Sequence, residues 1–154
     1  MRLALYQPDI PQNAGTIMRL AACVGVAVDI IEPAGFDASD RNLRRAGLDY
    51  LDRLELRRHI SFAAFDAWRR EAGHRLVLAT TRGSIPYPDF AFAPADILML
   101  GRESAGVPEA IHGAADARVL VPMRPGLRSL NVAVAAAMMV GEALRQTREF
   151  PPQL

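Results

Sequence analysis

Short apolar runs alternate with segments of helical periodicity along most of the chain. Because the apolar runs are nearly continuous, they are typical of strands that are covered on both faces. Repeated strand and helix units of this kind predict an α/β fold, with a mainly parallel sheet flanked by helices. The expected strands are residues 2–6, 27–31, 54–60, 76–79, 97–100 and 119–121, and the expected helices are 13–24, 39–46, 62–71, a short helix opened by Pro108, and 132–140.

Capping and turn residues mark where several of these elements begin and end. Asn13 can cap the first helix, and Gly25 directly follows its last residue, where a left-handed stop is common. Ser61 occupies the capping position before the helix at 62–71. Further stops are expected at Gly47 and Gly73, and the proline-rich residues 82–94 are interpreted as a loop.

The last predicted strand leads through a short loop into the most apolar segment of the chain. Residues 132–140 are apolar on every side of the predicted helix, yet they are far fewer than the ~20 residues of a membrane span. The helix must therefore be covered by the core or by a partner subunit. Its alanines allow another helix to approach closely, so a partner subunit can pack against this C-terminal helix.

Arg128, Ser129 and Asn131 stand immediately before this helix. At that position free backbone N–H groups and the positive end of the helix dipole point outward. Two interpretations remain open: Ser129 or Asn131 caps the helix, or the group binds a ligand.

Composition narrows the class of protein. A chain of 154 residues with 51% hydrophobic content is expected to form one domain, residues 1–154. It has neither a signal-like N-terminus nor an apolar run long enough for a membrane, so we expect a cytoplasmic protein with no membrane partner. The single cysteine, Cys23, excludes an intramolecular disulfide and a cysteine-based zinc cluster, and its apolar neighbours are typical of a small buried residue.

All the basic side chains in the chain other than histidine are arginines, although the net charge is only +1. Arginine makes planar bidentate contacts with phosphate. Six arginines lie between Arg41 and Arg58 against three acidic residues, a local positive excess. This segment is either a phosphate-binding surface or an ordinary solvated one.

Two further polar groups lie at the ends of predicted elements. Asn13-Ala-Gly-Thr-Ile-Met-Arg19 opens the first helix, where Arg19 either faces solvent or serves a site. Gly101-Arg-Glu-Ser-Ala-Gly-Val-Pro108 directly follows a strand and is either an ordinary turn or a backbone cradle for a ligand, but it matches neither phosphate-loop fingerprint. Because ligands of open α/β sheets bind beyond the carboxyl ends of strands, this segment and residues 128–131 can share one pocket.

Taken together, these segments resemble the three motifs of the SPOUT (SpoU-type) RNA ribose methyltransferases, in the same order and at similar spacing. The flanking runs Ile30-Ile-Glu-Pro33 and Leu43-Arg-Arg-Ala-Gly-Leu-Asp-Tyr50 are similar to the small subfamily that methylates the 2′-oxygen of the wobble cytidine or uridine of transfer RNA. The resemblance implies a C-terminal deep trefoil knot, an obligate homodimer, S-adenosyl-L-methionine as cofactor and the tRNA anticodon stem-loop as partner.

The resemblance also implies roles for individual residues, and none of them requires a metal. Arg19, Asn131 and Glu103 would be the catalytic residues. A guanidinium is effectively always protonated, so Arg19 is expected to bond a phosphate and the 2′-oxygen rather than act as a base. The cofactor-binding residues would be Ala79, Gly101, Val121, Ser129 and Leu130, and the RNA-binding residues would be Asn13, Arg41, Arg44, Arg45 and Arg128.

The chain departs from the family pattern at three positions. A serine-asparagine pair common in the last motif is replaced by Ala133 and Val134, and a tyrosine frequent in the last helix by Gly141. A catalytically weakened protein that binds tRNA or cofactor is therefore the alternative to an active enzyme. A Rossmann-type nucleotide enzyme is a third candidate and lacks its fingerprint. Cysteine-dependent C5 methylation is disfavoured because Cys23 has no activating neighbour in sequence.

Overall fold

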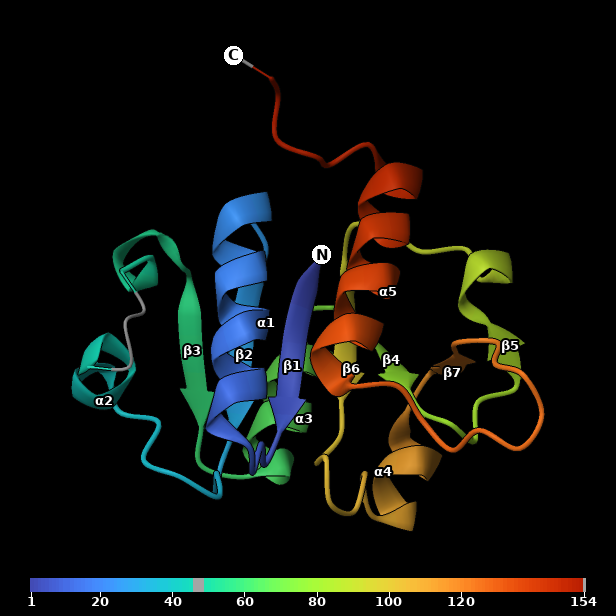
Figure 1. Cartoon of the computed structure of the whole chain (residues 1–154), viewed down its shortest axis with the longest axis horizontal. Coiled ribbons are helices and arrows are strands. Elements are labelled where there is room, and N and C mark those ends of the chain that lie inside the picture. Colours follow the sequence, from blue (N-terminus) through green and yellow to red (C-terminus); the bar gives the residue numbers. More distant parts are fainter. Residues whose placement is uncertain (46–48, 154) are drawn as a thin grey trace.

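The computed structural model describes residues 1–45 and 49–153 (Figure 1). Helices and strands alternate along this part of the chain, as the apolar pattern predicts. The strands are β1 (Arg2–Tyr6), β2 (Ala27–Ile31), β3 (Leu56–His59), β4 (Arg75–Ala79), β5 (Ile85–Pro86), β6 (Asp96–Leu100) and β7 (Ala117–Leu120). The helices are α1 (Pro11–Val24), α2 (Asp40–Arg45), α3 (Phe62–Glu71), α4 (Glu109–Ala114) and α5 (Val132–Thr147), with short 3-10 turns η1 (Leu51–Arg53) and η2 (Tyr87–Asp89).

The strands form one sheet in the order β3-β2-β1-β6-β4-β7-β5, and every pairing in it is parallel. Leu3 and Leu5 of β1 face one apolar core, which contains the inner sides of α1 and α5. Ala4 and Tyr6 face the second core, which contains buried residues of α3 and α4. Helices therefore cover both faces of the sheet (Figure 1), and the predicted fold class is confirmed.

One strand lies where the sequence predicts only a loop. Within residues 82–94, Ile85 and Pro86 form β5, which pairs with β7 at the edge of the sheet. A two-residue strand leaves no periodic pattern, and a proline is compatible with an edge strand, where its missing N–H costs no ladder bond. Only the pairing with β7 makes this segment a strand.

The helix ends follow the sequence signals in some places and not in others. Ser61 caps α3 by accepting a hydrogen bond from the backbone N–H of Ala64 at 3.1 Å, and Gly25 ends α1 at φ 74°, as predicted. The prediction that Asn13 caps α1 is wrong, because the helix already begins at Pro11, whose fixed φ suits a first helical position. The predicted helix at 39–46 is found as α2, whereas its expected stop at Gly47 lies outside the described residues.

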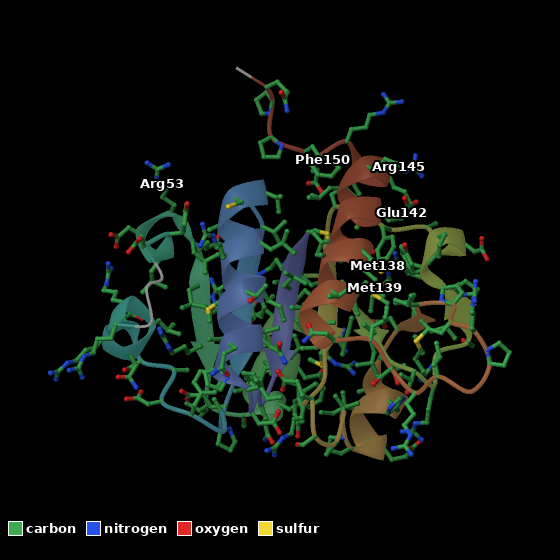
Figure 2. The ribbon with its side chains drawn as sticks, viewed as in Figure 1. Arg53, Met138, Met139, Glu142, Arg145 and Phe150 are labelled. Atoms are coloured by element: carbon green, nitrogen blue, oxygen red, sulfur yellow. The ribbon has the colours of Figure 1, made fainter. Side chains whose placement is uncertain are left out.

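The final helix is longer than predicted and only half buried by its own chain. Beyond Val140 it continues to Thr147, and its inner side packs into the core beside α1. Met139 is buried in the core, whereas its neighbour Met138 is exposed (Figure 2). Val134 is exposed as well. Among the described residues, no helix is long and apolar enough to cross a membrane.

The sequence misplaces Cys23, which is exposed rather than buried. Ala21 is buried, but Cys23 lies on another side of α1 in its last turn. Apolar neighbours in sequence do not fix burial in a helix, because consecutive residues point in different directions.

Candidate active site

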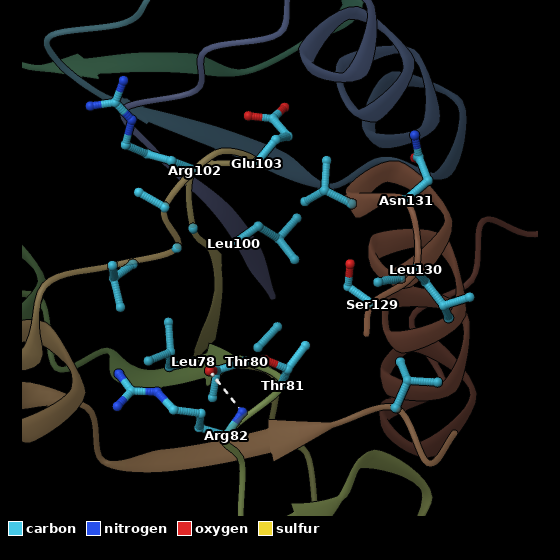
Figure 3. Close-up of a pocket in the computed structure, with 18 of the residues that line it drawn as sticks. Leu78, Thr80, Thr81, Arg82, Leu100, Arg102, Glu103, Ser129, Leu130 and Asn131 are labelled. Atoms are coloured by element: carbon cyan, nitrogen blue, oxygen red, sulfur yellow. Dashed lines mark hydrogen bonds between the residues drawn. The ribbon is translucent and has the colours of Figure 1, made fainter. Parts of the chain in front are cut away.

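A cavity of about 520 Å³ lies beyond the carboxyl ends of β4 and β6, and the start of α5 forms one wall (Figure 3). Parallel strands bring their carboxyl ends to one edge of the sheet, and ligands of such sheets bind there. Apolar side chains such as Leu78, Leu100 and Met139 line it together with polar groups. The lining comprises residues 78–82, 100–107, 121, 123 and 128–132, with Asn13, His112, Ala135 and Met139.

The loop after β6 is a closed turn that requires glycine. A Cβ at Gly101 would lie 2.8 Å from the carbonyl carbon of Gly106 and 2.9 Å from its Cα, so no larger residue fits. Arg102 and Gly106 exchange backbone hydrogen bonds of 3.0 and 2.8 Å across the turn, and Gly106 has φ 63°. The turn is therefore rigid, and it places Glu103 on the wall of the cavity.

Glu103 forms a carboxyl pair with Asp9, in the segment between β1 and α1. The Asp9 N–H donates to Glu103 Oε2 and the Glu103 N–H donates to Asp9 Oδ1, each at 3.2 Å. Ser104 Oγ also donates to Asp9. Burial raises the pKa of Glu103, and the neighbouring Asp9 raises it further. The hydrogen bonds with Glu103 and Ser104 lower the pKa of Asp9 to about 2. Asp9 is therefore the carboxyl group that ionises first, and Glu103 keeps its proton to higher pH.

Asn131 joins the last motif to the first. Its Oδ1 accepts hydrogen bonds from the N–H groups of Ala133 at 2.8 Å and Val134 at 3.3 Å, so it is the cap of α5. Its Nδ2 donates to Asn13 Oδ1 at 3.0 Å, and both asparagines line the cavity. The sequence left open whether this segment caps the helix or binds a ligand. Asn131 caps α5 and also lines the cavity, so the two interpretations are compatible.

The cavity brings together most of the site residues suggested by the sequence. The loop at 101–106 and the segment at 128–131, which are far apart in the chain, line the same cavity. The suggested residues in its lining are Asn13, Ala79, Gly101, Glu103, Val121, Arg128, Ser129, Leu130 and Asn131.

Arg19 is not among the residues that line the cavity. It is exposed on α1, and its guanidinium carbon lies 5.0 Å from the centroid of the Tyr50 ring. This distance permits a cation–π contact. Within one chain, the structure therefore does not bring Arg19 to Glu103.

The predicted basic surface lies beyond the edge strand β3 (Figure 1). The strands that end at the cavity, β6 and β4, lie nearer the other edge strand, β5. Arg41, Arg44 and Arg45 are exposed on α2. Arg44 is paired with Asp52, with Nη1 and Oδ2 3.2 Å apart, and Arg58 with Asp40, so part of the local positive excess is neutralised. Arg53 projects from η1 on the same side of the molecule (Figure 2).

Comparison with known proteins decides the family: the SpoU rRNA Methylase family matches residues 1–141. The chain belongs to this family. It is 69% identical over 144 residues to the tRNA (cytidine(34)-2′-O)-methyltransferase of Beijerinckia indica subsp. indica, covering 94% of this chain and 90% of that protein.

Two solved structures are similar to the SpoU family chain described here. One, from work on the 2-OH methylation of C/U34 on tRNA, has a TM-score of 0.84 and 42% identity, and the match covers 94% of each chain. The other is the SpoU methyltransferase AviRb from Streptomyces viridochromogenes in complex with AdoMet, with a TM-score of 0.84 and 31% identity, covering 95% of this chain and 57% of AviRb.

Sequence reasoning missed several residues that line the site of this SpoU protein or support it. Thr80, Thr81 and Arg82 directly follow β4, so the rule that sites form at strand ends was a signal that could have found them. Asp9 carries a weaker signal of the same kind, since it follows β1 after two residues. His112 lies on α4 and reaches the cavity only through packing, for which the sequence gives no signal.

The described residues contain no group of three or more histidine, cysteine, aspartate or glutamate side chains placed to hold a metal ion. The cavity instead offers backbone groups, hydroxyls, amides and the carboxyl group of Glu103 against apolar walls. Such a lining suits an organic ligand that has both apolar and polar parts.

Proposed function

We propose that this SpoU protein transfers a methyl group from S-adenosyl-L-methionine to the ribose 2′-oxygen of the wobble pyrimidine nucleotide of transfer RNA. The observation that carries the proposal is one cavity, built by the loop at 101–106 and the segment at 128–131, in a chain 69% identical to an enzyme named for this reaction. The similarity to a structure from work on C/U34 methylation supports the same substrate class.

The cavity fits the cofactor. Gly101 and Gly106 both line the cavity and carry no side chain, so backbone groups of the loop can approach a ligand directly. When bound, S-adenosyl-L-methionine supplies an electrophilic methyl group on a sulfonium. The residues that would hold it are Ala79, Gly101, Val121, Ser129 and Leu130, all of which line the cavity.

The remaining polar residues orient the RNA ribose. Methyl transfer requires the 2′-oxygen, the methyl carbon and the sulfur to be aligned, so positioning supplies much of the acceleration. Asn131 and Glu103 line the wall next to the proposed cofactor site, with Asn13 hydrogen-bonded to Asn131. Arg19 lies outside the cavity of its own chain, so its guanidinium must reach the 2′-oxygen from the adjoining surface or from a second chain.

A homodimer is supported by an exposed apolar stripe on α5 and the start of α1. Ile10 is 40% exposed, Leu130 41%, Val134 49% and Met138 39%, so large apolar side chains face solvent on α5 and just before α1 and α5. A two-fold symmetric interface covers such a stripe with the same stripe of a second copy. This placement agrees with the sequence-based expectation that α5 is covered by a partner subunit.

The RNA surface is proposed to combine Arg128 and Asn13 at the cavity with Arg41, Arg44 and Arg45 on α2. Exposed arginines contact phosphates of the anticodon stem-loop at some distance from the reacting nucleotide.

A transfer RNA substrate also supports the expected cytoplasmic location, where transfer RNA works.

The strand order supports the trefoil knot expected from the resemblance, within a single methyltransferase domain. β7 lies between β4 and β5, and Val119 pairs with both Ala79 and Ile85. Residues 80–84 must therefore cross β7 near Val119, and a Cβ on Gly83 would lie 2.7 Å from the carbonyl carbon of Val119. The knot requires residues 121–131 to run through this loop, and a crystal structure in which they pass outside it would contradict the proposal.

The function is tested by methyl transfer from radiolabelled S-adenosyl-L-methionine to unmodified transfer RNA, followed by mapping of the modified nucleotide. A transcript with a 2′-deoxy wobble nucleotide is the control. We expect label on the wobble ribose and none on the control, and label on the control would move the reaction off the ribose. Binding of RNA and cofactor without transfer would indicate the catalytically weakened protein that the departures at Ala133, Val134 and Gly141 suggest.

A further inference from the structure

The side chain of Asp9 contacts three consecutive residues of the loop after β6. Its carboxylate accepts from the N–H of Glu103 at 3.2 Å and from the hydroxyl of Ser104, and the guanidinium of Arg102 lies 3.6 Å away. Its backbone N–H donates in return to the Glu103 carboxylate at 3.2 Å. One side chain on the segment after β1 thus holds a loop 94 residues away in sequence.

The segment that carries Asp9 packs against the backbone of Gly35. The N–H of Gly35 donates to the carbonyl of Pro8 at 2.8 Å. A Cβ on Gly35 would lie 2.8 Å from Asp9 Cβ and 2.9 Å from Asp9 Cα, so the two backbones are in direct contact. Gly35 therefore limits movement of Asp9 away from the loop. The hydrogen bonds between Asp9 and Glu103 then hold the Glu103 carboxyl on the cavity wall.

We propose that Asp9 is a positioning residue, which holds the Glu103 carboxyl in the cavity and places its own negative charge beside it. The inference rests on the proposed methyl transfer, because Glu103 is assigned there to the reacting end of the site. It adds to that function a residue that does not line the cavity itself.

The surroundings of the pair decide which carboxyl keeps the proton. The Asp9 carboxylate has a donor from Glu103, a donor from Ser104 and the charge of Arg102. Glu103 accepts from the Asp9 N–H, and the side chain of Asn13 lowers its pKa, but burial and the neighbouring Asp9 raise that pKa above its usual value. Removing the charge of Asp9 therefore lets Glu103 ionise at lower pH, since a nearby like charge disfavours ionisation.

Two substitutions separate the two parts of the proposal. Asp9→Asn keeps the shape and the oxygen that accepts from the Glu103 N–H but removes the charge, so the loop stays in place. Asp9→Ala removes every side-chain contact to the loop. The exposed Asp89 on η2, outside the cavity, provides Asp89→Asn as the matched control.

The first measurement is the carboxyl titration of Glu103 by carbon-13 NMR on the full-length protein, without substrate. We expect the titration midpoint to move to lower pH in Asp9→Asn and to stay in place in Asp89→Asn. An unmoved midpoint in Asp9→Asn would overturn the charge coupling between the two carboxyl groups. Because this measurement needs no turnover, it can succeed or fail independently of the proposed function.

The second measurement is single-turnover methyl transfer to transfer RNA. In Asp9→Ala we expect the rate to fall by ~10-fold or more, as displaced catalytic groups do, with transfer RNA affinity unchanged. Restoration of most of the rate in Asp9→Asn at a pH shifted to the new Glu103 midpoint would support positioning. An unchanged rate in Asp9→Ala would overturn it, whereas absence of transfer in the wild type would refute the proposed function instead.

Discussion

The cavity end of the sheet and its β3 end are held in place by different contacts. At the cavity, Gly101 and Gly83 let backbone lie directly on backbone, and asparagine and carboxyl side chains bond neighbouring loops. At the β3 end, α2 is exposed, and Arg44 and Arg58 form exposed or partly exposed ion pairs. Exposed pairs contribute only ~0–1 kcal/mol each, so that end tolerates change.

Because of this difference, we expect substitutions at the two ends of the sheet to impair different properties of the protein. A shift of atoms in the cavity should impair cofactor binding or the chemical step, since both depend on placement. A change at α2 should affect RNA affinity through charge, and the effect should depend on salt. The following substitutions test whether the two ends are separable in this way.

The largest effect is expected from Gly101→Ala. The new Cβ would overlap the Gly106 backbone at 2.8 Å, so the turn must open. Calorimetry should show S-adenosyl-L-methionine affinity lower by ~10²-fold or more, because the loop supplies the proposed cofactor contacts. Gly113→Ala on α4, where a Cβ meets nothing within 4 Å, is the control and should bind normally. Normal binding by Gly101→Ala would remove the loop from the cofactor site.

Arg19→Ala should slow single-turnover methyl transfer by roughly 10²-fold while leaving cofactor affinity nearly unchanged, as expected for a donor to a developing oxyanion. Arg19→Lys should restore little, because an ammonium lacks the planar fork. The measurement also tests the catalytic role of Arg19, which does not line the cavity of its own chain. If the alanine variant reacts at the wild-type rate, Arg19 belongs to the solvent face.

The outer side of α5 is tested by Val134→Glu combined with Met138→Glu, since both side chains are exposed and apolar. Buried carboxylates without partners are strongly unfavourable, so sedimentation should show monomers at micromolar concentration. Ala67→Glu adds a carboxylate to the exposed side of α3 and should leave a dimer. A well-folded wild-type monomer at this concentration would contradict the proposed interface.

The smallest effect is expected at the β3 end. Replacing Arg41, Arg44 and Arg45 together by alanine should weaken transfer RNA binding and reduce the slope of log affinity against log salt by about one per lost phosphate contact. The rate at saturating RNA should be unchanged. Arg70→Ala with Arg145→Ala removes two exposed arginines elsewhere. Equal binding by the triple variant and the wild type would remove α2 from the RNA surface.

Local patterns in the sequence located every strand except β5, and at least one end of most helices. The apolar run at 27–31 matches β2, and the serine before residue 62 caps α3, because burial on both faces and capping are encoded by neighbouring residues. The three motifs likewise indicated the family through their order and spacing, and the family match over residues 1–141 confirms it.

Only the tertiary structure decided which distant groups meet. The pairing of Asp9 with Glu103, the bond between Asn13 and Asn131, and strand β5 all depend on the strand order, with β7 placed between β4 and β5. The exposure of Cys23 and of one side of α5 also depends on which surfaces the neighbouring elements cover. Such contacts join residues up to 118 positions apart, and no local periodicity carries that information.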